Sequence, residues 1–137
     1  MTDDIRPTTR WRVEKEKEAG ELAAGRITQD ECYMAKLFPD EFLDRTDTVL
    51  DAFAAAMAVL PTTSDGYPEV MSNIKTIVLA LNAINESGGG AWIETGEREA
   101  LCEYIDTVIV QHGIDIDVLA QSQNVTRYEL TDEWREW

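Results

Sequence analysis

Apolar residues recur at intervals of three and four along most of the chain, which is the spacing of one face of an α-helix. Outside these stretches only 92–93 and 124–130 are expected to be extended. We therefore expect an all-α, single-domain helical bundle of five or six helices. The helices are predicted over about 10–24, 31–38, 47–60, 68–86, 95–111 and from 115 or 117 to 120.

The segment 68–86 has the strongest helical pattern and carries few charges. Apolar residues lie on both of its sides, so this helix is expected at the centre of the bundle. In the helix before it, Ala55 and Ala58 lie opposite the apolar face, where small side chains allow a second helix to come close. The sequence thus indicates both a core and a possible surface for self-association.

Three parts of the chain differ in character. Residues 1–9 are an N-terminal segment that can be disordered, residues 10–38 are expected to form a helical hairpin, and residues 40–137 form the main helical body. Trp134 and Trp137 stand close together near the end of the chain, and buried tryptophans commonly anchor a segment. We therefore expect a docked C-terminal tail.

The turn of the hairpin has the pattern Leu22-x-x-Gly25-x-Ile27-Thr28-x-x-Glu31. In this pattern Thr28 and Glu31 match a capping box, in which two side chains satisfy free amides at a helix start. The pattern is similar to that of the small SHOCT-type oligomerisation hairpins of bacteria. The resemblance covers about twenty residues and is structural; it implies a short αα-hairpin.

Charge is strongly unbalanced along the chain. Twelve Lys and Arg residues oppose 27 Asp and Glu residues, which gives a net charge of −15, and residues 46–137 alone carry 4 basic and 16 acidic side chains. Such a surface repels nucleic acid and anionic lipid and attracts basic partners. Adaptation to high internal salt is an alternative origin of the same acidity.

Acidic side chains gather on the outer face of the helix predicted at 95–111. Glu99, Glu103 and Asp106 lie within one sector of its helical wheel, opposite the apolar residues, with no Lys or Arg three or four positions away. Glu94 and Glu97 add charge at the helix start, beside Trp92. One interpretation is a ridge that meets a basic protein, with Trp92 as an aromatic anchor. The alternatives are a solvated face and a carboxylate metal site.

Motifs for cofactor or metal chemistry are missing. No calcium-loop, di-iron or zinc-ligand spacing occurs, and Gly88–Gly90 lacks the Lys and Ser or Thr of a phosphate-binding loop. Cys32 and Cys102 are expected to be reduced, small apolar residues. We expect His112 to interact with carbonyl groups at a helix end rather than to act in catalysis. No residue is therefore assigned as catalytic, cofactor-binding or metal-binding.

The sequence favours a non-enzymatic acidic binding domain, of the immunity, inhibitor or adaptor type, that masks a basic surface of a partner protein. The alternative is a structural or oligomerisation module, and a homo-oligomer is possible, in which acidity serves solubility or salt adaptation. A cofactor-free enzyme that uses two carboxylates as acid and base is the third interpretation. No binding to nucleic acid or membrane is expected. Without a basic start or a leading apolar segment, the chain is expected to be cytoplasmic.

Overall fold

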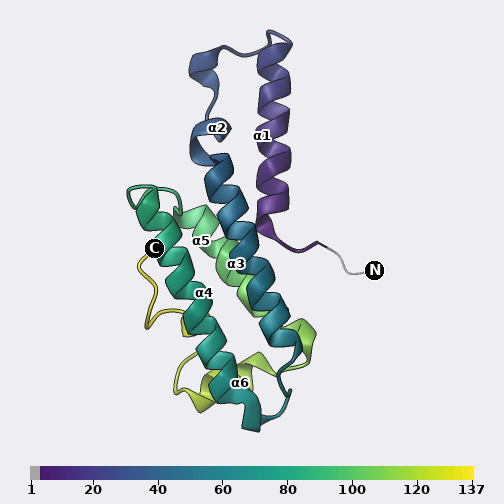
Figure 1. The fold of residues 1–137 in the computed structure, drawn as a ribbon, viewed down its shortest axis with the longest axis vertical. Coiled ribbons are helices and arrows are strands. Elements are labelled where there is room, and N and C mark those ends of the chain that lie inside the picture. The colour runs from purple at the N-terminus through teal and green to yellow at the C-terminus, as the bar shows by residue number, and fades with distance from the viewer. Residues whose placement is uncertain (1–3) are drawn as a thin grey trace.

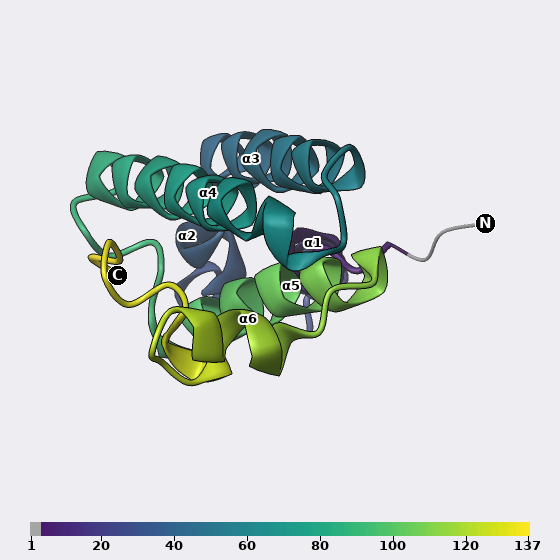
Figure 2. The same ribbon diagram turned by 90° about the horizontal axis from the view of Figure 1, so that it is seen from below.

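The structure, a computed structural model, describes residues 4–137 as an all-α bundle in two layers. Helices α3 and α4 form one layer, and α5 with the shorter α6 forms the other (Figures 1 and 2). Helix α1 packs against both α3 and α5 and extends beyond them (Figure 1). Within the described part of the chain no strand occurs. The α-helices are α1 (Pro7–Ala23), α2 (Met34–Leu37), α3 (Asp40–Ala58), α4 (Tyr67–Ser87), α5 (Thr95–His112) and α6 (Ile116–Ser122).

One continuous hydrophobic core joins the layers. It is built where the apolar faces of α3, α4 and α5 meet. The central helix is α3, which packs against α1, α4 and α5; the sequence analysis placed 68–86 there, but α4 packs mainly against α3 and keeps an exposed outer side. The largest fully buried side chains include Leu50 on α3, Ile74 and Leu81 on α4, and Leu101 and Ile105 on α5. None of the described helices has both the length and the apolar character needed to cross a membrane.

Helix α3 begins seven residues earlier than the sequence pattern indicates. Pro39 precedes it, and Asp40 and Glu41 lie in its first turn, where their charge favours the helix dipole. The added turns bury Phe42 and Leu43, at 0% and 1% exposure. Leu43 continues the buried stripe of Thr46, Leu50 and Phe53, whereas Phe42 packs on an aromatic side chain from α1, a partner that the local pattern of α3 does not reveal.

That aromatic side chain is Trp11, which is 3% exposed. Its ring is stacked on Phe38 at 5.2 Å and on Phe42 at 5.9 Å, measured between ring centroids. Aromatic pairs of this kind bury large apolar areas and add about 1 kcal/mol beyond that area. The N-terminal helix is thereby part of the core and not a separate module.

The N-terminal segment and the hairpin both differ from expectation. Residues 1–3 lie outside the described part, but α1 already begins at Pro7, and Thr8 is fully buried. The returning arm of the hairpin has no full helix: it consists of a 3₁₀ turn at Gln29–Glu31 and the four-residue α2. Glu18 replaces the missing helical bonds, because its carboxylate accepts hydrogen bonds from the backbone amides of Tyr33 and Met34.

The C-terminal tail is docked, as the two tryptophans predict. Trp134 and Trp137 are half-buried against the core. Asn82 on α4 donates to the Trp134 carbonyl at 2.8 Å and accepts from the amide of Glu136 at 3.0 Å. The predicted extended segment at 124–130 is instead a loop that contains the 3₁₀ turn η3 (Arg127–Glu129).

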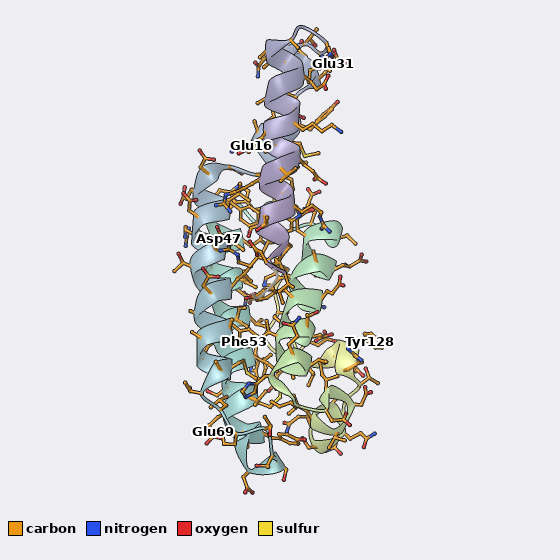
Figure 3. All side chains as sticks on the ribbon, turned by 90° about the vertical axis from the view of Figure 1, so that its right-hand side faces the viewer. Glu16, Glu31, Asp47, Phe53, Glu69 and Tyr128 are labelled. Carbon is orange, nitrogen blue, oxygen red and sulfur yellow. The ribbon has the colours of Figure 1, made fainter. Side chains whose placement is uncertain are left out.

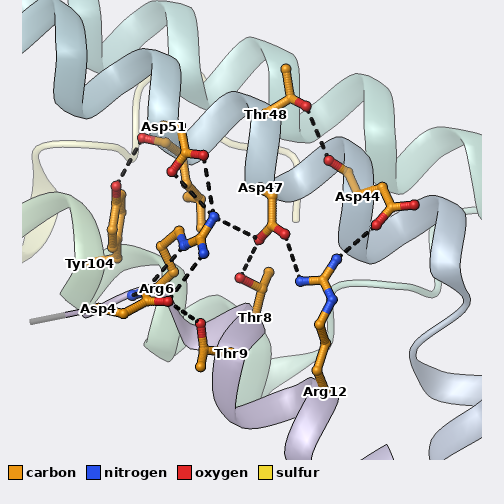
Figure 4. Close-up of polar contacts among 11 residues, drawn as sticks. Asp4, Arg6, Thr8, Thr9, Arg12, Asp44, Asp47, Thr48, Asp51 and Tyr104 are labelled. Atoms are coloured by element: carbon orange, nitrogen blue, oxygen red, sulfur yellow. Dashed lines mark hydrogen bonds and ion pairs between the residues drawn. The ribbon is translucent and has the colours of Figure 1, made fainter.

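Asp47 fixes α1 against α3 (Figure 4). Its carboxylate accepts a hydrogen bond from the hydroxyl of Thr8 and pairs with Arg12 at 2.6 Å and with Arg6 at 3.7 Å. Arg12 also pairs with Asp44. Arg6 pairs with Asp51 at 3.2 Å. We call this group the Asp47 cluster; its members are Asp4, Arg6, Thr8, Arg12, Asp44, Asp47 and Asp51. Arg6 and Arg12 therefore hold α1 against α3 as an internal clamp, and they neutralise Asp47 and Asp51. The sequence analysis had assigned no cationic partner to these two acids.

Replacing Asp47 by Ala should lower the free energy of unfolding by about 2 kcal/mol, because the buried Thr8 hydroxyl loses its acceptor and Arg12 loses its closest carboxylate. The matched control is Asp44→Ala, which removes the same charge one helical turn away. The Asp44 side chain is 75% exposed, against 20% for Asp47, so its loss should cost less than about 0.5 kcal/mol. Urea unfolding of both variants measures the difference, and equal losses would contradict the clamp.

Candidate functional site

An open groove runs along the outer face of α5. Its volume is about 590 Å³, and a smaller hollow of about 130 Å³ continues it toward the C-terminal tail. We call the two together the α5 groove. Its α5 wall is formed mainly by Glu99, Cys102, Glu103 and Asp106, and its other wall by Arg127, Tyr128, Thr131 and Arg135.

Local sequence signals build both walls. Helix α5 starts where the Glu97 carboxylate accepts from the Glu94 amide, and it ends at Gly113, whose φ of 104° suits glycine. Asp115 then caps α6 by accepting from two backbone amides. After α6, the Thr126 hydroxyl and amide both bond Glu129, and this small capping box forms η3. The chain is thereby turned back beside α5.

Asp106 is the most perturbed side chain of the groove. Burial raises the pKa of its carboxyl group to about 6; the positive charge of Arg127 opposes this shift, and the negative charge of Glu103 adds to it. Among residues 4–137 nothing forms a hydrogen bond or an ion pair with this carboxylate. A half-buried carboxylate without a direct partner gains stability from any cation that enters the groove.

The opposite wall carries two arginines in different states. Arg135 is held by several contacts. Its guanidinium group pairs with Asp132 at 3.2 Å and donates hydrogen bonds to the Thr131 hydroxyl and to the Cys102 sulfur. It also lies over the Trp137 ring. Arg127 forms no ion pair with a described residue, and its Nε is buried without an acceptor there. Arg127 therefore gives the second wall of the groove a positive charge opposite the acids of α5.

The structure brings together three of the six residues predicted as a partner-binding ridge: Glu99, Glu103 and Asp106 line one wall. Glu94 and Glu97 do not join them, because they form the start of α5. Trp92 points inward: its ring lies 5.6 Å from that of Phe42, and a Cβ added to Gly88 would come within 2.2 Å of a Trp92 ring atom. Trp92 is therefore part of the packing and does not serve as an exposed anchor.

The exposed aromatic residue of the site is Tyr128, which the sequence analysis missed. It is 80% exposed and points away from the body on the side of η3 (Figure 3). Tyrosine supplies a large, rigid contact area, which is why it is common at the centre of protein interfaces. The signal in the sequence is the Thr126–Glu129 capping box, since it places the two intervening side chains, Arg127 and Tyr128, on a tight turn.

Other candidate groups have structural roles. His112 Nε2 lies 2.7 Å from the carbonyl oxygen of Leu60, so this histidine bonds a carbonyl beyond the end of α3, a neighbouring helix. Within residues 4–137 no three His, Cys, Asp or Glu residues are arranged to hold a metal ion. The chemistry available to the groove is thus binding of a cation and uptake of a proton at Asp106.

Comparisons with protein-family models, with curated proteins and with solved structures gave no match for this chain. The function is therefore argued from the geometry and charge of the groove.

Asp106 should destabilise the free protein at neutral pH. Its pKa is raised from 3.8 in the unfolded chain to about 6 in the folded state, so ionisation above about pH 6 opposes folding. Asp106→Asn should therefore raise the free energy of unfolding by about 1 kcal/mol at pH 7, after allowing for solvent screening of this half-exposed group. Below about pH 3 the carboxyl is protonated in both the folded and the unfolded state, and the advantage should vanish. Urea unfolding of both proteins at the two pH values measures it, and a gain that persists in acid would contradict the assignment.

Proposed function

We propose that the protein is a non-enzymatic acidic binding domain that masks a basic surface of a partner protein, and that the α5 groove receives the partner's Arg or Lys side chains. The observation that supports this most is Asp106: a half-buried carboxylate in the α5 groove, with its pKa raised to about 6 and no direct partner among residues 4–137. Keeping such a group costs folding stability, and a bound cation restores it.

The charge around the groove also suits a basic partner. Glu99 and Glu103 are exposed on the same wall, and two N-terminal arginines, Arg6 and Arg12, are held at Asp51 and Asp47 on α3. Complementary charge would speed association and make it sensitive to salt. Tyr128 would cover the apolar stems of the partner's basic side chains. The proposal places this interaction in the cytoplasm, where the two cysteines stay reduced.

An arginine-rich peptide is a defined probe for this proposal. A fluorescently labelled oligoarginine should bind the full chain with a stoichiometry of one, and the double variant Glu99→Gln/Glu103→Gln should bind it about tenfold more weakly. The matched control is Glu14→Gln/Glu16→Gln, which removes the same charge from exposed positions on α1, away from Tyr128 (Figure 3). Fluorescence anisotropy at low and physiological ionic strength measures both affinities. Equal weakening by the two double variants would mean diffuse attraction, and it would overturn the assignment of the groove.

Asp106→Asn gives a second, independent test with the same peptide. The variant should bind more weakly than the parent at pH 7 although it is more stable, since the neutral amide no longer attracts the cation. The difference in affinity should shrink at pH 5, where the parent carboxyl is largely protonated. An unchanged affinity at pH 7 would exclude Asp106 from the binding site.

A further inference from the structure

The outer face of α3 and α4 has properties unlike those of the rest of this acidic molecule. A shallow groove of about 280 Å³ runs between the two helices on the side away from α5, and none of its lining residues is charged. The residues that form it include Val49, Ala52 and Ala56 on α3 and Asn73, Thr76 and Ala80 on α4. We call this surface the α3/α4 face. Helices α3 and α4 lie in front of α5 in Figure 1.

A large apolar side chain projects from the same helix layer. Leu79 on α4 is 46% exposed, although the inner side of the same helix is buried in the core. Leu79 lies one residue before Ala80, which lines the groove, so a protruding side chain and an apolar recess stand side by side. A surface with both features can fit a second copy of itself, the leucine of each copy entering the groove of the other.

The charges at the edge of this face indicate that its binding partner is a second copy of the chain. Lys75 and Glu86 are both exposed on α4, and neither forms an ion pair within the described part of the chain. They stand eleven residues apart, which is three helical turns and about 16 Å, so they lie on one edge of α4 yet too far apart to pair with each other. Residues 76–85 between them are uncharged.

We infer that the α3/α4 face is a homodimer interface, in which α4 of one copy runs antiparallel to α4 of a second copy across a two-fold axis near Ala80. Lys75 lies five residues before Ala80 and Glu86 six residues after it, so the point midway between them falls beside Ala80. The axis therefore brings Lys75 of each copy opposite Glu86 of the other and forms two equivalent ion pairs. Two-fold symmetry requires this kind of self-complementarity, and a basic partner would find no acidic patch on the groove.

The size of the face sets the strength of the dimer. Two helices about 9 Å apart and about 30 Å long present roughly 550 Å², below the ~800 Å² per partner of standard interfaces. The net charge of −15 on each copy opposes association further. We therefore expect a dimer that dissociates in the micromolar range and that becomes tighter as salt screens the repulsion between copies.

Sedimentation velocity of the full chain, over a micromolar concentration series at two ionic strengths, tests the dimer. Leu79→Glu should weaken it at least about tenfold, because a charge enters the uncharged centre of the interface. The matched control is Val118→Glu on α6, which introduces the same charge at a side chain of equal exposure, 46%, and should leave the dimer unchanged. Circular dichroism melts of both variants verify that the fold is retained.

Exchange of the edge charges tests the antiparallel arrangement itself. Lys75→Glu should weaken the dimer, because it places two carboxylates opposite each other, and Lys75→Glu/Glu86→Lys should restore it without changing the net charge of the parent. A monomer throughout the series, or a dimer indifferent to Leu79→Glu, would overturn the inference. Failure of the double exchange to restore association would overturn the axis near Ala80.

The salt dependence separates this interface from the α5 groove. Binding of a cationic peptide to the groove weakens with salt, whereas self-association through the α3/α4 face strengthens. The two surfaces also lie on opposite sides of the molecule, as Figure 3 shows with α3 on one side and Tyr128 on the other. The Leu79→Glu variant should consequently bind the oligoarginine peptide as the parent does.

Discussion

The polar contact between α1 and α3 centres on one carboxylate, that of Asp47. It accepts hydrogen bonds from the buried Thr8 hydroxyl and from Arg12, it forms an ion pair with Arg6, and so it joins a helix rich in charge to the hydrophobic body. Arg6 and Arg12 also pair with other acids of α3, and Lys15 pairs with Asp40. Three basic side chains are therefore engaged at α3, and the acids on the α5 wall of the groove form no ion pair within the described residues.

The ion pairs at α3 also explain why three parts of the surface differ in charge. The N-terminal side of α3 is acidic in sequence but paired in space, the outer wall of α5 is acidic and directly unpaired, and the α3/α4 face is nearly neutral. A chain with a charge of −15 can approach another copy of itself only through a neutral region, and it attracts a basic partner where acids lie unpaired. The two proposed surfaces are therefore physically compatible, and one molecule can use both at once.

The ionised carboxylate of Asp106 lowers the folding stability of the protein that contains it. Its carboxylate is half-buried beside Glu103, with Arg127 near but not in contact as an ion pair, and burial is the larger influence on its pKa. Most surface acids of this protein cost nothing, because water solvates them. A carboxylate that is partly withdrawn from water and left without a direct partner is unusual, and its stability improves when a cation arrives. This separates Asp106 from Glu99 and Glu103, which lie in the same groove but are solvated.

The amino-acid sequence by itself determined the all-α class, the buried stripe of α4, the docked tail and the sector shared by Glu99, Glu103 and Asp106, because helical periodicity and caps are local properties. Only the tertiary structure decided which charges are neutralised: residues 6 and 47 are 41 positions apart, and no local pattern connects them. It also turned Trp92 inward, buried Phe42 under Trp11, and placed Arg127 and Tyr128 opposite α5. These outcomes depend on which helices pack together, and that is decided by the summed burial of apolar surface over the whole chain.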